Sequence, residues 1–445
     1  MLPEVMIVKV VHGGQGLADL PDGRKVFVWN ALPGETVRIR IIKNKRSYAE
    51  AIAEEIIVAS PDRVVPIDEN YLATSPWQIL SSTQEDSYKI GIVRELMQQA
   101  GLDAYELLDS VVPDGIQSGK SSGQGRLESH GAETAPMSAR YHYRNKMEYS
   151  FWGDDQGLHL ALHIRGSHGK QIVSGSALAM PAVDAAANLI LAELQERRIR
   201  ASDLKSLVIR ASQNGDVVAA LFVRQSKFPR LRVSSSIKPD GLKGIRVYFS
   251  NPRSPASVRT RLLYEIGNCE LTDSLLGRVF VYDVDSFFQV NIPVYESVLK
   301  SIRSHIIGDP IDMYAGVGSI GLSVADKAVT LIEMDSPTVT MARRNAADSH
   351  VHATVIEASS EEVLEQIDSA KPLIVDPPRA GLHARVITRC LDVLPPQIIY
   401  LSCNPATQSR DLSLLQSAYT VKTLEVYNFF PHTPHIEVLA VLVRK

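Results

Sequence analysis

The segment YLSCNPATQSRDL contains the side chain with the most reactive chemistry in the chain, the thiol of Cys403. The apolar run before it predicts a buried strand, and Pro405 predicts the first turn of a helix. Strand ends of parallel α/β sheets meet ligands, and a thiolate at a helix N-terminus is stabilised by the helix dipole and free amides. Cys403 is therefore a candidate nucleophile. A buried structural cysteine is the competing interpretation, and it fits Cys390 and Cys269 better.

Two other segments carry ionisable residues that we expect near Cys403. DPPRAGL follows the preceding predicted strand and contains Asp376 and Arg379, and HTPHIEVL places Glu437 on the last strand. Two prolines stiffen the first of these loops, so Asp376 and backbone carbonyls could face a planar base. These neighbours favour the nucleophile over the structural interpretation of Cys403.

The segment DMYAGVGSIGLSVA predicts a nucleoside-binding turn between a strand and a helix. Its glycines, beginning with Gly316 and Gly318, would let a ligand approach the backbone. Glu333 closes the next strand 17 residues after Gly316 and could accept both ribose hydroxyls. Asp335 competes for that contact, and Glu333 is preferred because it lies nearer the expected strand end.

The acidic character of this region favours S-adenosylmethionine over NAD as the ligand. No basic residue occurs between Asp312 and Asp326 to neutralise a pyrophosphate. The positively charged sulfonium of S-adenosylmethionine would be stabilised by nearby carboxylates, here Asp312, Glu333 and Asp376.

The elements that must position these residues form a regular pattern from Asp309 onward. Short apolar runs alternate with helix-compatible segments, which predicts a doubly wound α/β sheet. The last two strand-like runs predict an antiparallel pair at its far end. With 445 residues, 45% of them hydrophobic and 22% charged, the chain is long enough for two or three folded domains.

The N-terminal segment predicts a small β-domain, because short strand-like runs alternate with glycine-containing turns between residues 5 and 58. Small barrels of this kind bind RNA, and a generic barrel is an equal alternative. The two interpretations differ in the role of three basic residues, which would either contact RNA or form a solvated hairpin tip: Lys43, Lys45 and Arg46.

The stretch from residue 140 to residue 262 is strongly basic, with 20 Lys and Arg against 9 Asp and Glu, although the whole chain has a formal net charge of −3. Its strand-like and helical segments indicate an α+β domain. A basic surface interleaved with aromatic residues suits RNA, and a solvated sheet face is the alternative. The candidate RNA contacts are Arg140, Arg144 and Lys146, which lie among Tyr141, His142 and Tyr143.

Taken together, the motifs resemble those of the S-adenosylmethionine-dependent RNA 5-methyluridine methyltransferases. The resemblance covers nearly the whole chain and rests on VHGGQGLADLPDGRKVFVWNALPGETVRIRI, YRNKMEYSF, FFQVN, DMYAGVGSIGL, DPPRAGL, YLSCNPATQSRDL and HTPHIEVLAVL. It implies a TRAM-type RNA-binding barrel in residues 1–58 and a central α+β RNA-binding domain in residues 59–275, with an exposed insertion at about 113–138. Residues 276–445 would form a Rossmann-like methyltransferase domain.

The same resemblance implies methyl transfer from S-adenosyl-L-methionine to C5 of a uridine in tRNA or rRNA. Cys403 would bond covalently to C6 of the uracil, and Glu437 would remove the C5 proton. Arg379 and Phe430 would contact RNA, and Phe429 or His432 are other candidates for stacking on the base. The cofactor-binding residues would be Gln289, Tyr314, Gly316, Gly318, Glu333 and Asp376.

The cysteine content departs from the family pattern. Many members carry four cysteines for an iron–sulfur cluster, three of them in a segment resembling ENYLATSPWQILSSTQEDSYK. Here Leu72 and Ser75 stand at two of those positions, and no cysteine occurs before Cys269. We therefore expect no iron–sulfur cluster and no other metal.

Two other functions stay open at this point, a cytosine-C5 RNA methyltransferase and a non-catalytic RNA-binding protein that retains the fold. The chain has no run of about 18 apolar residues and no basic, apolar leader after Met1, so we expect neither a membrane span nor a secretory signal. Three scattered cysteines indicate a reducing compartment. We expect a cytoplasmic monomer.

Overall fold

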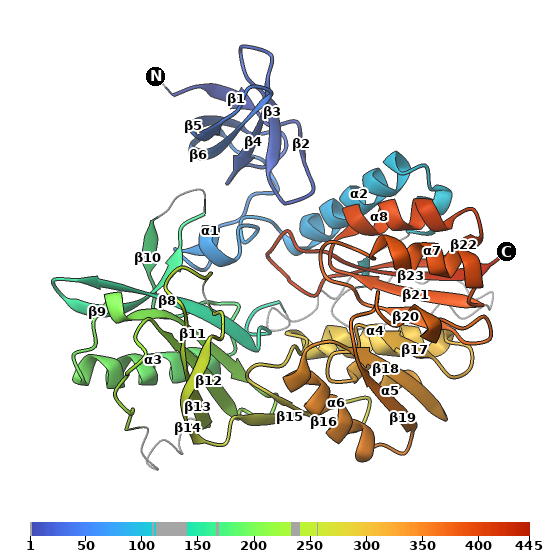
Figure 1. The fold of residues 1–445 in the computed structure, drawn as a ribbon. Helices are drawn as coiled ribbons and strands as arrows, with labels where there is room; N and C mark the ends of the chain where they lie inside the picture. The colour runs from blue at the N-terminus through green and yellow to red at the C-terminus, as the bar shows by residue number, and fades with distance from the viewer. Residues whose placement is uncertain (1, 109–110, 113–139, 166–168, 233–240, 256) are drawn as a thin grey trace, which may run out of the picture.

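The structure is a computed structural model that describes residues 2–108, 111–112, 140–165, 169–232, 241–255 and 257–445. The described residues form a small N-terminal β-unit, a central sheet and a larger C-terminal sheet covered by helices (Figure 1). The whole of the predicted insertion at about 113–138 lies outside the described residues.

The N-terminal unit is a six-stranded sheet with strand order β1-β5-β6-β4-β3-β2. Its strands alternate apolar and polar residues, so that one face, including Val26, Val28 and Ile39, is buried in a separate core. β1, at one end of this order, also contacts β3, the strand next to the other end, so the sheet curls toward a barrel. The strands are β1 (Glu4–Met6), β2 (Lys9–Val10), β3 (Gly16–Asp19), β4 (Lys25–Trp29), β5 (Thr36–Asn44) and β6 (Tyr48–Val58).

The central unit is a seven-stranded sheet with order β10-β9-β8-β11-β12-β13-β14. Every residue of β11 and β12 is buried, because one face packs on α3 and the other on the core of the C-terminal unit. Its elements are β8 (Lys146–Asp154), β9 (Gly157–His163), β10 (Lys170–Ile172), α3 (Pro181–Glu196), β11 (Leu204–Ala211), β12 (Val217–Val223), β13 (Leu242–Phe249) and β14 (Arg261–Gly267). A hairpin of β15 (Glu270–Leu275) and β16 (Arg278–Asp283) follows.

The C-terminal unit is an eight-stranded sheet with order β19-β18-β17-β20-β21-β23-β22-β7. Its first five strands in this order are parallel, and β23 runs antiparallel to both β21 and β22, which confirms the predicted antiparallel pair. The strands are β17 (Ile311–Met313), β18 (Ala328–Glu333), β19 (His352–Glu357), β20 (Leu373–Val375), β21 (Gln397–Ser402), β22 (Tyr419–Tyr427), β23 (Glu437–Arg444) and β7 (Val111–Val112).

Helices cover both faces of this sheet, as a doubly wound fold requires. One core holds residues of α4, α5 and α6, and the other holds residues of α2, α7 and α8. The helices are α2 (Ser82–Gln99), α4 (Ile292–His305), α5 (Ser319–Val324), α6 (Ser336–Ala347), α7 (Ala384–Val393) and α8 (Pro405–Leu415); the short α1 (Tyr71–Thr74) precedes α2.

The packing of α2 bears on the domain boundaries, which stay predictions. Sequence reasoning placed this helix in the central domain, but in the structure α2 lies beside α8 (Figure 1). Ile92, Val93 and Met97 share a core with the C-terminal sheet. We propose that residues 82–108 and 111–112 belong structurally to the C-terminal unit.

Candidate active site

Four of the predicted site residues follow the carboxyl ends of neighbouring strands. The register pairs Met313 with both Ile332 and Val375, so Tyr314, Glu333 and Asp376 come to one edge of the sheet. The chain order reverses between β17 and β20, which is where open α/β sheets bind ligands. Cys403 follows β21 at the same edge.

Cys403 and Glu437 meet although they lie on different strands. β21 and β23 are antiparallel with Ser402 opposite Val438, so the next position of each strand places Cys403 across from Glu437. Cys403 is partly exposed, and Glu437 is 4% exposed. Glu437, Asp376 and Arg379 all act electrostatically on the thiol. The structure therefore brings these four predicted residues together.

The thiol of Cys403 is not activated in the free protein, which corrects the expectation of a dipole-stabilised thiolate. Burial raises its pKa to about 11, the carboxylates of Glu437 and Asp376 add to the rise, and Arg379 opposes it. The N-terminus of α8 is capped locally, because the Asn404 side chain accepts a hydrogen bond from the Ala406 amide (3.2 Å). The free protein thus keeps Cys403 as a neutral thiol at neutral pH.

The two carboxyl groups beside Cys403 are also shifted toward their neutral forms. Burial raises the pKa of Asp376 to about 7. Burial and then repulsion from Asp376 hold the pKa of Glu437 well above its usual range, with Arg379 acting in the opposite direction. Paired carboxyl groups with raised pKa values are typical of sites that transfer protons.

The glycine turn and Glu333 are in direct contact. Glu333 Oε2 accepts a hydrogen bond from the Gly316 amide (3.0 Å), and its Oε1 accepts from the Asp335 amide (2.8 Å). Gly316 and Gly318 have φ values of 57° and 85°, a backbone region that glycine adopts without strain. Asp335 instead caps α6 through Thr338. Both carboxylates therefore accept hydrogen bonds, and Glu333 stays the proposed ribose contact because it ends β18 beside the glycine turn.

Gln289 lies in a buried segment that joins the central sheet to the site. Its side chain is 6% exposed, and its carbonyl accepts a hydrogen bond from Asn145 Nδ2 (3.0 Å). Two residues later, Asn291 Nδ2 donates to the carbonyl of Phe429 (3.1 Å). Sequence reasoning missed both asparagines, although they stand within the quoted motifs YRNKMEYSF and FFQVN.

The loop between β22 and β23, residues 428–436, is held by a buried ion network that sequence reasoning did not detect. Glu85 and Lys89, both of α2, form a fully buried salt bridge of 2.8 Å. Lys89 Nζ donates to Asn428 Oδ1 (2.6 Å), and Glu85 accepts from the His432 amide (3.0 Å). Arg140 adds an ion pair with Asp86 (2.5 Å).

We expect Lys89→Met to lower the free energy of unfolding by about 3–5 kcal/mol, because it removes the shorter of the two arginine and lysine ion pairs of the buried Glu85 carboxylate and leaves Arg140 at 3.6 Å. Urea denaturation followed by fluorescence would measure the loss. The double variant Glu85→Gln/Lys89→Met removes both charges and is expected to recover part of it. A double variant no more stable than Lys89→Met would show that the charge imbalance is not the cause.

The predicted RNA contacts differ in how far they are exposed. Lys43 pairs with Glu50 (2.6 Å), and Lys45 and Arg46 are exposed at the tip of the hairpin between β5 and β6. Arg140 is 8% exposed and paired, so its burial argues against the predicted RNA contact. Burial lowers the pKa of Lys146 to about 8. Arg144 is partly exposed, and Arg379 is exposed and acts electrostatically on the Cys403 thiol.

The candidates for stacking on a base also separate. Phe429 is fully buried, which argues against the predicted stacking role. His432 is 4% exposed and stacks on Tyr141 with 4.3 Å between ring centroids. Phe430 is partly exposed and meets the edge of His435. Among these residues, Phe430 is the stacking candidate that the geometry retains.

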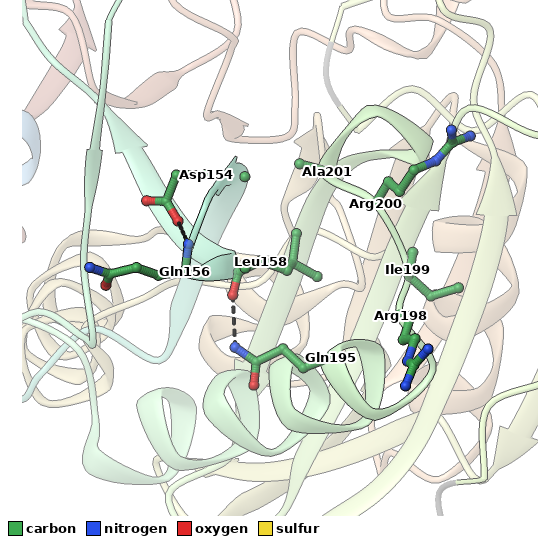
Figure 2. Close-up of a pocket in the computed structure, with 10 residues that line it drawn as sticks. Asp154, Gln156, Leu158, Gln195, Arg198, Ile199, Arg200 and Ala201 are labelled. Atoms are coloured by element: carbon green, nitrogen blue, oxygen red, sulfur yellow. Dashed lines mark hydrogen bonds between the residues drawn. The ribbon is translucent and has the colours of Figure 1, made fainter.

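A separate cavity of about 620 Å³ lies between the β8–β9 hairpin and the end of α3 (Figure 2). Asp154 and Gln156 line it on the hairpin, and Arg198 and Arg200 line it on the other side. None of its lining residues is a predicted site residue. It is not the candidate active site, because no ionisable pair comparable to Cys403 and Glu437 lines it.

The segment expected to bear the cluster cysteines in related proteins is α1 and the turn after it. Ser75 is fully buried and accepts a hydrogen bond from Gln78 Nε2 (2.7 Å), and Leu72 uses its carbonyl to accept from Arg165. Among the described residues, no group of three or more His, Cys, Asp or Glu side chains is arranged to hold a metal ion.

No helix in the described part of the chain has the length and apolarity needed to cross a membrane.

Comparison with known proteins defines the class. A family profile described as tRNA (Uracil-5-)-methyltransferase matches residues 133–445, and a TRAM domain profile matches residues 4–53. Since the first match spans more than half of the chain, the protein belongs to the tRNA (uracil-5-)-methyltransferase family of S-adenosylmethionine-dependent RNA methyltransferases. The predicted family and the predicted TRAM domain are thereby confirmed.

Individual relatives agree with this assignment. A protein of Enterococcus faecalis described as an uncharacterized RNA methyltransferase is 28% identical over 470 residues, covering 99% of this chain and 97% of that protein. A protein of Listeria innocua with the same description is 29% identical, with coverages of 99% and 97%. The crystal structure of Pyrococcus abyssi tRNA (uracil-54, C5)-methyltransferase with S-adenosyl-L-homocysteine has a TM-score of 0.73 at 20% identity, covering 99% of this chain and 100% of that one. The three-part fold is therefore shared.

Proposed function

We propose that this enzyme transfers a methyl group to C5 of a uridine in tRNA or rRNA through a covalent bond between Cys403 and C6 of the base. The observation that carries the proposal is the register of β21 and β23, which sets Cys403 across from Glu437 at the ligand-binding edge of the sheet. A nucleophile and a carboxylate base on one side of a bound ring are the two groups that this reaction requires.

The residues at the sheet edge fit S-adenosylmethionine. Open space lies where a Cβ atom of Gly316 would project, so a ligand can approach the backbone there. Asp312 is fully buried, and its Oδ1 has no hydrogen-bond partner among the described residues. Glu333 would hold the ribose, and Tyr314, Gln289 and Asp376 would line the rest of the site. The bound cofactor would supply an electrophilic methyl group on a positively charged sulfur.

The protein residues then divide the reaction into two parts. The Cys403 thiolate bonds to C6, and the electron pair of the C5=C6 double bond moves into an enolate, so that C5 becomes nucleophilic enough to accept the methyl group. The Glu437 carboxylate next removes the proton from C5. That electron pair restores the C5=C6 double bond and expels the Cys403 thiolate. Asp376 would orient the edge of the uracil.

The raised pKa values predict a reaction that accelerates with pH. Cys403, with a pKa of about 11, and Glu437, whose pKa is raised, must both be deprotonated to act. Asp376 and Arg379 are the other ionisable groups that act on the thiol. We expect kcat/KM, which reports the free enzyme, to rise steadily between pH 6 and 9. Initial rates at constant ionic strength would measure it, and a flat or falling profile would contradict the assignment.

The base specificity is tested with labelled S-adenosylmethionine and two RNAs that contain only uridine or only cytidine as pyrimidine. Label should enter the uridine RNA alone. Incorporation into the cytidine RNA would favour cytosine-C5 methylation, and cofactor binding without incorporation into either would favour a non-catalytic protein. Mapping of 5-methyluridine in total RNA from cells with and without the enzyme would identify the RNA and the position.

A further inference from the structure

The glycine turn and the start of α5 are held by side chains from three different elements. Glu333 of β18 and Asp312 of β17 each accept a hydrogen bond from a glycine amide of this segment (3.0 and 2.8 Å). The third contact comes from α4, where the Tyr295 hydroxyl is hydrogen-bonded to Ser319 Oγ (2.7 Å). Tyr295 is the contact to which the proposed reaction assigns no role.

The side chain of Tyr295 is held by its surroundings in one place. It is 1% exposed, and the described residues offer its hydroxyl one hydrogen-bond partner, the partly exposed Ser319. Its ring packs edge-on against Phe429, with 6.1 Å between the ring centroids. Burial and the nearby carboxylates of the site raise the pKa of Tyr295, so the phenol is neutral. A well-packed ring therefore presents a neutral hydroxyl to Ser319.

Tyr295 also connects the glycine turn with the segment that contains Gln289. α4 begins directly after FFQVN, with Asn291 at its N-cap position, and the Tyr295 amide donates to the Asn291 carbonyl (3.0 Å). α4 packs against α5, the helix that follows the glycine turn (Figure 1). The two segments proposed to bind the cofactor are therefore joined through the first turn of α4 and the hydrogen bond between Tyr295 and Ser319.

We propose that Tyr295 is a positioning residue, which acts through Ser319 to hold the glycine turn in place relative to Gln289 and so sets the shape of the S-adenosylmethionine site. A ligand that approaches the backbone at Gly316 binds more tightly when that backbone is already held in the bound geometry. This inference rests on the proposed function, since it takes the cofactor to lie between Gln289 and the glycine turn.

Tyr295→Phe tests the hydroxyl alone, because it keeps the ring and its packing. Loss of this hydrogen bond should raise the dissociation constant of S-adenosylmethionine about fivefold, as measured by isothermal titration calorimetry. The dissociation constant of a uridine-containing RNA, measured by fluorescence anisotropy, should not change. A purely structural role would lower the melting temperature and leave cofactor affinity unchanged, and that result would overturn the proposal.

A double-mutant cycle tests the route through Ser319. Ser319→Ala removes the other partner of the hydrogen bond, so the double variant Tyr295→Phe/Ser319→Ala should bind S-adenosylmethionine no more weakly than Ser319→Ala alone. If the two substitutions instead weaken binding independently, so that their effects multiply, Tyr295 does not act through Ser319 and the proposal is wrong. The melting temperature of each variant would show that the protein is folded.

Tyr427→Phe is the matched control. Tyr427 is buried in the same core and also packs edge-on against Phe429, but its hydroxyl donates to Glu425 (2.6 Å) rather than to the glycine turn. This variant should lower the melting temperature and leave the affinity for S-adenosylmethionine unchanged. A loss of affinity equal to that of Tyr295→Phe would mean that any hydroxyl of this core has the same effect, which would overturn the assignment.

Failure of this inference and failure of the proposed function give different results. Glu333→Ala tests the cofactor site itself and should weaken binding of S-adenosylmethionine more than Tyr295→Phe does. If neither variant affects binding, the cofactor lies elsewhere and both assignments are wrong. If only Glu333→Ala weakens binding, the site stands and the role of Tyr295 is wrong. If both weaken binding but uridine is not methylated, the role of Tyr295 stands and the proposed chemistry is wrong.

Discussion

Replacement of Cys403 by alanine is expected to lower methyl transfer by about 10⁴-fold or more and to remove any covalent RNA adduct. C5 of uracil is a poor nucleophile until a bond at C6 converts the ring into an enolate, and alanine cannot form that bond. The measurements are incorporation of labelled methyl into RNA and an SDS-resistant protein–RNA band. An adduct that persists in Cys403→Ala would falsify the assignment.

The chain offers a matched control in Cys390. This residue lies in α7, is fully buried, and has a pKa that burial raises to about 12. Cys390→Ala should therefore retain methyl transfer and the adduct, with a modest loss of stability from the small cavity. Binding of S-adenosylmethionine should be retained in both variants, because neither cysteine belongs to the glycine turn.

The sheet and the glycine turn could be predicted because their signals are local. Short apolar runs, helix-compatible spacers and the glycines from Gly316 onward each occupy a few consecutive residues. Glu333 was predicted to lie near them, and its hydrogen bond to the Gly316 amide shows that it does. The contact follows directly from the strand–turn–helix pattern.

The features that sequence reasoning missed depend on contacts between distant parts of the chain. Lys89 donates a hydrogen bond to Asn428, which lies 339 positions further along the chain. No local sequence pattern predicts this contact. Arg140 was assigned to RNA from its charge and its aromatic neighbours, and neither feature reveals that Asp86 lies beside it. Both contacts are formed by tertiary packing, which a local sequence pattern does not specify.

The pKa of Cys403 illustrates the same limit at the site itself. The helix dipole is a local argument and predicts a stabilised thiolate. Burial and the charges of Glu437 and Asp376 come from other strands, and together they outweigh it. In the free protein, these contributions therefore favour the protonated thiol of Cys403.

Replacement of Glu437 by glutamine is expected to accumulate the covalent RNA adduct while turnover falls by about 10²- to 10⁴-fold. The amide has the shape of the carboxyl group but cannot remove the proton from C5, so the bond between Cys403 and C6 persists. The carboxylate of Glu437 raises the pKa of Cys403, so its removal should lower that pKa and leave attack at least as fast. Rapid-quench kinetics would separate adduct formation from release.

Glu425→Gln provides the comparison for Glu437→Gln. Glu425 lies on the neighbouring strand β22, where it accepts hydrogen bonds from Ser301 and Tyr427 (2.6 Å each), and it has no place in the proposed reaction. Normal release is expected in that variant. Rapid turnover without adduct in Glu437→Gln would remove Glu437 from the role of base. Slow adduct formation instead of slow release would mean that this carboxylate acts before the methyl group is transferred, as the group that deprotonates the thiol.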